Sequence, residues 1–279
     1  MDQRTPGQVV RSALLLACFA GVVFAQNGAE ASAQATLTPG AAAAPTPVSV
    51  NVAMTQGMAA LKADQARRAL TDFQQVLQAD PNNTAANLLA STAAVETFQG
   101  QLAVQYAEKA KQLDPKNWKI HTTLVAAYSA AGMTKQRDEE RALLRELHQN
   151  GPPDARLATG FLLEMFPVGA YRVDAVDYFE PMGRFHTYYR FLVRRADGKR
   201  VWEVDVESDD FDQKSWAAAN PAEAAGGNRQ FQITGHGDEG SNPVDYRMFS
   251  GRPDYDNIRV MVVEILRSRG VPGAPASGR

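Results

Sequence analysis

Residues 78–83 read QADPNN, and residues 112–117 read QLDPKN. The prolines of these two segments, Pro81 and Pro115, lie 115 − 81 = 34 positions apart. Each proline prevents a helix from continuing, because it lacks an N–H and its ring clashes with the preceding turn. From position 52 to position 147 the chain is rich in Ala, Leu, Gln and Glu, and apolar residues recur every three or four positions. The pattern predicts helices that repeat with a period of 34 residues.

Small side chains recur in register with the two turns. The first repeat has Gly57, Ala60, Ala69 and the aromatic Phe73, the second has Ser91, Ala94, Ala103, Ala107 and Ala110, and the third has Trp118, Leu124 and Tyr128. This pattern resembles the tetratricopeptide repeat family, in which small residues let paired helices pack closely. The resemblance covers residues 51–150 and implies an all-α array of three repeats, of which the last is atypical.

The third repeat departs from the family pattern in its second helix. Arg137 and Arg141 stand where the family has an alanine and an aromatic residue. A run of charges on a helix is usually a solvated face, and the last repeat of an array carries a polar outer surface. We therefore expect residues 137–141 to face solvent.

The resemblance also implies a concave surface, built from the first helix of each pair, that binds a peptide or a partner helix. Family members that bind chaperone C-terminal carboxylates use Lys, Asn and Arg in this groove. Here Met54 and Met58 replace the first two and only Lys119 fits, so carboxylate clamping is not expected. Alternatively, the C-terminal part of the chain or the linker covers the apolar residues, and the array is a scaffold. The predicted lining is Met54, Met58, Leu61, Leu88, Thr92, Val95, Glu96, Lys119 and Thr122.

Beyond the Gly-Pro-Pro sequence at 151–153 the apolar period changes from 3.6 to 2. Residues 185, 187, 189, 191 and 193 should face a core, and Asp197-Gly198 should turn the chain into a second strand at 200–206. Further strands are expected at 171–179, 229–234 and 244–249, and the segment at 161–166 could be a strand or a helix. A short helix is expected at 214–219 and a longer one at 254–269. We expect an α+β domain at 155–270 with a mainly antiparallel sheet, and a disordered tail at 271–279. The α+β domain resembles no family that we recognise.

Residues 1–25 have the pattern of a secretion signal: Arg4 and Arg11, an apolar run at 13–24, and small-residue cleavage before Gln26. The run is shorter than the ~20 apolar residues that span a bilayer. Residues 26–50 are rich in Ala, Thr and Pro, which predicts a disordered linker. The signal predicts a periplasmic or secreted protein that is not transmembrane after cleavage.

Cys18 is the only cysteine of the chain. Residues 15–18 (LLAC) resemble a lipobox, which would make Cys18 a lipid anchor. However, Leu16 is bulky for that motif and the apolar run continues past Cys18. Ordinary cleavage is therefore favoured over lipidation, and the mature chain then contains no thiol.

Composition excludes several classes of function. With 29 basic and 31 acidic residues and a net charge of −2, the chain has no basic patch for nucleic acid. None of its four histidines is spaced i, i+4 for a metal ion, and no cofactor is expected. The loop at 235–240 is interpreted as a turn rather than a metal site, and the acidic run at 207–212 as a helix cap rather than a Ca²⁺ site.

The leading hypothesis is a non-catalytic adaptor or scaffold that binds a protein or peptide. The alternative is that the α+β domain is a small-ligand receptor or an enzyme that the repeats position. A pocket that joins His236 with Asp238 or His186 would favour the alternative. The polar face of the hairpin offers a candidate surface for an anionic partner, with Tyr188, Arg190, Arg194 and Arg200.

Overall fold

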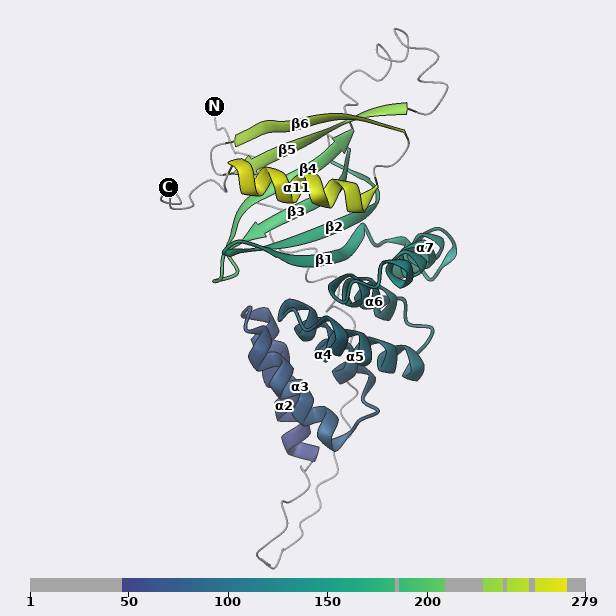
Figure 1. Ribbon diagram of the computed structural model, residues 1–279. Coiled ribbons are helices and arrows are strands. Elements are labelled where there is room, and N and C mark those ends of the chain that lie inside the picture. Colours follow the sequence, from purple (N-terminus) through teal and green to yellow (C-terminus); the bar gives the residue numbers. More distant parts are fainter. Residues whose placement is uncertain (1–46, 184–185, 209–227, 238–239, 251–253, 270–279) are drawn as a thin grey trace, which may run out of the picture.

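The computed structural model describes residues 47–183, 186–208, 228–237, 240–250 and 254–269 (Figure 1). Residues 47–150 form three helix pairs. The pairs are α2 (Pro47–Lys62) with α3 (Ala66–Ala79), α4 (Thr84–Glu96) with α5 (Gly100–Leu113), and α6 (Trp118–Ala130) with α7 (Thr134–Asn150). The helices thus follow the predicted period of 34 residues.

Helix α2 begins at Pro47 and not at position 51, so the predicted linker of residues 26–50 is wrong at its C-terminal end. Proline is well suited to the first position of a helix, because its missing N–H would have no partner there and its φ is already helical. The helix also brings in Val50, which packs against the apolar core of the array.

The repeated six-residue turn supplies the cap of the next helix. The Asn83 side chain accepts a hydrogen bond of 3.0 Å from the backbone N–H of Ala86 at the start of α4. Asn117 caps α6 in the same way through Lys119, at 3.2 Å. Asparagine in these turns therefore satisfies a backbone donor that a helix start leaves without a partner.

The small residues that carry the repeat pattern lie where helices touch. Ala69, Ala94 and Ala107 are each 0% exposed. A Cβ atom at Gly57 would lie 2.6 Å from the Phe73 ring, and one at Gly100 would lie 2.3 Å from the backbone oxygen of Ala130. The helices approach too closely at these points for a larger side chain.

A third repeated feature was not predicted. The turn inside each pair contains one residue with a left-handed backbone: Asp64 (φ 59°), Phe98 (φ 58°) and Gly132 (φ 71°). These positions are 98 − 64 = 34 and 132 − 98 = 34 residues apart. In each turn the next residue donates a backbone hydrogen bond of 2.8 Å to the carbonyl five positions earlier, as in a Schellman cap. All three repeats therefore end their first helix with the same left-handed turn.

The C-terminal part is an antiparallel sheet with strand order β1-β2-β3-β4-β5-β6 among the described strands. The short helix α8 (Pro153–Arg156) leads into it, and α11 (Tyr255–Arg269) crosses one face (Figure 1). The ambiguous segment at 161–166 is a strand. The strands are β1 (Gly160–Val168), β2 (Tyr171–Met182), β3 (Thr187–Arg194), β4 (Arg200–Ser208), β5 (Asn228–Gly237) and β6 (Gly240–Ser250).

The face of the sheet beneath α11 forms its core. Tyr189, Phe191 and Val193 of β3 are at most 2% exposed, which confirms the predicted alternation where it is described. They share one apolar cluster with side chains of β4 and with Ile258 and Val262 of α11. The predicted mainly antiparallel sheet with a C-terminal helix is confirmed.

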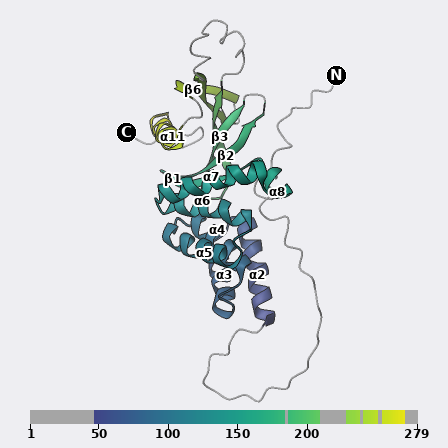
Figure 2. The same cartoon turned by 90° about the vertical axis from the view of Figure 1, so that its right-hand side faces the viewer.

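The array and the sheet share core side chains. Helix α6 lies along β1, the edge strand, and the array extends away from that edge (Figures 1 and 2). Val125 of α6 and Leu144 of α7 belong to the apolar cluster of the sheet, whereas Met165 of β1 belongs to that of the array. The two predicted domains therefore meet through a continuous packed junction.

Several predictions lie outside the described residues. They are the signal, Cys18, the linker to position 46, residues 209–212 of the acidic run, the helix at 214–219, Asp238 and Glu239, and the tail. Among the described helices, none combines the length and apolar character needed to cross a membrane.

Replacement of Gly100 by alanine should destabilise the fold, because its Cβ would overlap the backbone at Ala130 and Ala131. We expect a loss of roughly 1–3 kcal/mol, the usual cost of overpacking. Urea unfolding followed by circular dichroism measures it. Gln101→Ala, at an exposed position beside it, is the control and should change stability by less than about 0.5 kcal/mol. Equal stability of the two variants would contradict the close approach.

Candidate functional site

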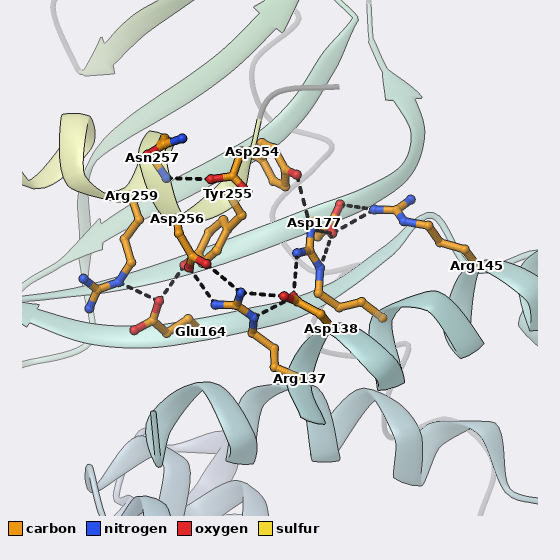
Figure 3. A network of polar contacts seen from close by, with 12 residues as sticks. Arg137, Asp138, Arg145, Glu164, Asp177, Asp254, Tyr255, Asp256, Asn257 and Arg259 are labelled. Atoms are coloured by element: carbon orange, nitrogen blue, oxygen red, sulfur yellow. Dashed lines mark hydrogen bonds and ion pairs between the residues drawn. The ribbon is translucent and has the colours of Figure 1, made fainter. Parts of the chain in front are cut away.

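The prediction that residues 137–141 face solvent is wrong for Arg137, Glu140 and Arg141, whereas Asp138 and Glu139 are exposed as predicted. Arg137 is 3% exposed and Glu140 is 7% exposed. Arg137, Arg141 and Arg145 lie four residues apart, on one side of the helix. That side faces β2 and α11, because the chain folds back over the last repeat (Figure 3).

Two of these arginines hold one buried carboxylate of the sheet. Asp177 of β2 is 0% exposed. It accepts a 2.8 Å hydrogen bond from Arg141 and two bonds of 2.9 Å from Arg145. Burial lowers the pKa of Arg141, but Asp177 and the Tyr189 hydroxyl outweigh burial and raise that pKa above its ordinary value. The Arg141 guanidinium therefore keeps its positive charge beside Asp177.

Arg137 joins α7 to the start of α11. Its two terminal nitrogens donate to the two carboxylate oxygens of Asp256, at 2.7 and 2.8 Å, and its Nε donates to Asp138 at 2.9 Å. Hydrogen bonding to Arg137 holds the pKa of Asp256 below its ordinary value. The planar, two-point geometry fixes the orientation of α11 as well as its position.

A second polar group lies next to this pair, between β1 and α11. The Tyr255 hydroxyl and the Nε atom of Arg259 each donate a 2.7 Å hydrogen bond to the same oxygen of Glu164 (Figure 3). The Arg259 guanidinium also lies over the Phe166 ring, 4.3 Å from its centroid. Burial and the Glu164 charge raise the pKa of Tyr255 well above its ordinary value, so Tyr255 remains a hydrogen-bond donor.

The predicted groove residues divide into two groups. Met54 and Val95 are 8% and 1% exposed, and both belong to the apolar cluster that joins the helices. They pack inside the array, so their prediction as surface lining is wrong. The other seven are half-buried and keep part of their side chains at the surface: Met58, Leu61, Leu88, Thr92, Glu96, Lys119 and Thr122.

Glu96 lies where the array meets the sheet. Burial raises its pKa to about 7, Arg172 and Arg194 of the sheet lower it, and Asp64 and Asp174 raise it. Arg172 is engaged by Asp64 of the first turn at 3.2 Å and by Asp174 at 2.9 Å, and Arg194 contacts Asp174 at 2.6 Å. The Glu96 carboxylate makes no hydrogen bond to the residues that the structure describes. Sequence reasoning missed this cluster, whose members are up to 194 − 64 = 130 positions apart.

The histidines that are described do not form a common site. The His121 ring lies 2.7 Å from the Glu140 carboxylate, inside the third repeat, and Lys111 contacts the other oxygen of that carboxylate. His148 stacks on Phe179 with a centroid distance of 4.4 Å. His186 is exposed, with a φ of 50°. The His236 side chain is outside the described residues, so its predicted turn role stays a prediction.

The cations of the predicted hairpin surface are paired within the sheet. Arg190 donates two hydrogen bonds of 2.8 Å to Asp205, which is 2% exposed. Arg194 pairs with Asp174, and Arg200 pairs with Glu203. The face therefore lacks the excess of positive charge that an anionic partner requires.

Substitution of Glu96 by glutamine should stabilise the protein above neutral pH. The pKa of Glu96 is about 7 in the folded state and 4.5 in the unfolded state. Its contribution to the free energy of unfolding is therefore fully present below pH 4.5 and is lost as the pH rises through about 7. We expect the parent to lose about 1–2 kcal/mol more than Glu96→Gln between pH 5 and pH 8. Urea unfolding at both pH values measures this, with the exposed Glu146→Gln as control. Parallel pH dependence of Glu96→Gln and the parent would refute a raised pKa of Glu96.

No family model matches the chain, and no curated protein matches it. Its helical part is similar to solved tetratricopeptide domains. The domain of Sgt2 from Aspergillus fumigatus is 28% identical, with a TM-score of 0.35 over 40% of this chain and 74% of that chain. The domain of Arabidopsis OM64 is 21% identical, with a TM-score of 0.35 over 39% of this chain and 90% of that chain. The first tetratricopeptide domain of human RPAP3 is 19% identical, with a TM-score of 0.35 over 40% of this chain and 87% of that chain. With its 34-residue helix pairs and identical turns, the region from Pro47 to Asn150 is a tetratricopeptide-like repeat array.

Proposed function

We propose that this chain is an exported, non-catalytic adaptor that binds a peptide or a partner helix on the first two repeats. The proposal rests on the partial exposure of the Met58 and Leu88 side chains. These apolar side chains on α2 and α4 remain half-buried. Partly exposed methionine and leucine on the first helices of neighbouring repeats provide an adaptable apolar surface for a helix or an extended peptide.

The junction restricts where a partner binds. Helix α6 lies along β1, and the C-terminal end of α4 lies against Arg172 of β2. The third repeat and the C-terminal ends of the first helices are therefore occupied by the sheet of the same chain. A partner has access to the part of α2 and α4 around Met58, Leu88 and Thr92, with Lys119 and Thr122 of α6 at its margin.

Export is supported by residues 1–25 and by their cleavage pattern before Gln26. The adaptor then acts in the periplasm or outside the cell, and a mature chain without cysteine suits an oxidising compartment. No chemical step is part of this proposal, and the sheet serves to cap the array and to hold it in one orientation.

The double substitution Met58→Glu and Leu88→Glu should abolish partner binding. Peptides are first selected from a displayed random 12-residue library on residues 26–279, and their affinities are then measured by fluorescence anisotropy. We expect the variant to bind at least about tenfold more weakly, because two carboxylates would have to be desolvated against apolar peptide side chains.

Gln75→Glu with Gln105→Glu is the matched control. It adds the same charge at exposed positions of α3 and α5 and should leave the affinity within about twofold. Circular dichroism checks that both variants are folded. If no peptide is selected, or if the folded Met58→Glu, Leu88→Glu variant keeps its peptides, the proposed surface is wrong.

A further inference from the structure

A cavity of about 450 Å³ lies at the junction of the array and the sheet. Its walls come from four segments that are distant in sequence: the turn at Phe98, the turn at Gly132, the strand β1, and the start of α11 with Arg259. The volume falls in the range of roughly 300–1,000 Å³ that is typical of small-ligand sites. The cavity is separate from the groove residues named above, none of which lines it.

Phe98 is the least expected residue in this cavity. The equivalent left-handed positions of the other two repeats are Asp64 and Gly132, residue types that adopt positive φ at low cost. Phenylalanine at φ 58° costs about 1–3 kcal/mol of backbone strain. Burial of the side chain does not offset this strain energy, because the side chain is 48% exposed. The ring is held at the cavity at the expense of stability, which favours a role in binding.

Some hydrogen-bonding groups of the cavity already have partners, and others do not. Its two carboxylates are already engaged, Glu164 by Tyr255 and Arg259, and Asp256 by Arg137. Arg259 uses only its Nε atom, and Figure 3 shows its terminal nitrogens on the side away from Glu164. These nitrogens make no hydrogen bond to any residue that the structure describes.

The Ser129 hydroxyl, also in the cavity wall, is buried and has no hydrogen-bond partner among the described residues. Because that oxygen is buried, the unused hydrogen-bonding capacity that a ligand can reach is the guanidinium fork of Arg259. A guanidinium fork matches the two oxygens of a carboxylate. Phe98, which is 48% exposed, provides flat apolar surface for an aromatic ring.

We propose that this cavity binds aromatic carboxylates, with the carboxylate on Arg259 and the ring against Phe98. The shared chemistry is a benzene-like ring a few bonds from a carboxylate. A free small acid supplies it, and so does an aromatic residue beside an acidic residue in a peptide. The proposal goes beyond the adaptor function and does not depend on it, because it uses other residues.

Binding is tested by isothermal titration calorimetry of residues 26–279 with 3-phenylpropanoate. We expect saturable binding with a dissociation constant of about 1 mM or tighter. The neutral 3-phenylpropanamide and the ringless propanoate should each bind at least about tenfold more weakly. The dipeptide N-acetyl-Phe-Asp-amide is titrated in parallel, and tighter binding of the dipeptide or of the free acid identifies the source of the natural ligand.

Two variants separate binding from folding. Phe98→Gly should weaken binding at least about tenfold and keep or raise the melting temperature, because glycine adopts the left-handed turn without strain. Arg259→Gln should weaken binding to a similar extent. The control Asp64→Gly places glycine at the equivalent turn of the first repeat, outside the cavity, and should bind within about twofold of the parent.

Several results would overturn the proposal. They are the absence of saturable binding by the parent, equal binding of the amide or of propanoate, and unchanged binding by folded Phe98→Gly or Arg259→Gln. Loss of 12-residue peptide binding by Met58→Glu, Leu88→Glu leaves this site untouched, so the failures of the two proposals are distinguishable.

Discussion

The pairing of Arg141 and Arg145 with Asp177 is the interaction on which the architecture depends. A carboxylate with no exposed surface is stable only when opposite charge and hydrogen bonds replace its lost hydration. Asp177 receives both from α7, at distances of 2.8 to 3.2 Å. The last helix of the array therefore supplies the positive charge that this buried position of β2 needs. Arg137 likewise ties α7 to α11 through its ion pair with Asp256. Breaking one partner of such a pair typically costs about 3–5 kcal/mol.

This constraint places the sheet along one edge of the array. The left-handed turns of all three repeats then lie at the sheet: Asp64 pairs with Arg172, and Phe98 and Gly132 line the junction cavity with β1. A repeat array needs a polar or covered end, since each repeat buries its apolar surface only against its neighbours. The sheet supplies that covered end. It covers the third repeat and leaves Met58 and Leu88 of the first two repeats partly exposed.

The sequence predicts the local features of the fold and misses the features that depend on distant contacts. Period 34, the Asn83 and Asn117 turns and the alternation of β3 are local, and the structure agrees with them. The strand at 161–166 was ambiguous because a short apolar run has no decisive period, and pairing with β2 settles it. The charges of α7 were misassigned because burial by a later segment leaves no periodic signal. The replacement of small and aromatic family positions by Arg137 and Arg141 was the available clue that this helix packs against something other than a fourth repeat.

The most direct test of this account is whether the array and the sheet unfold together. Pulsed hydrogen exchange with mass spectrometry, across a urea series, reports the second-repeat helix α5 and the strand β3 separately. The account predicts one shared midpoint for both segments in the parent, and separate midpoints in Asp177→Asn, which removes the charge that holds α7 to β2. Different midpoints in the parent, or a shared midpoint in Asp177→Asn at unchanged stability, would contradict the central role of the Asp177 ion pair.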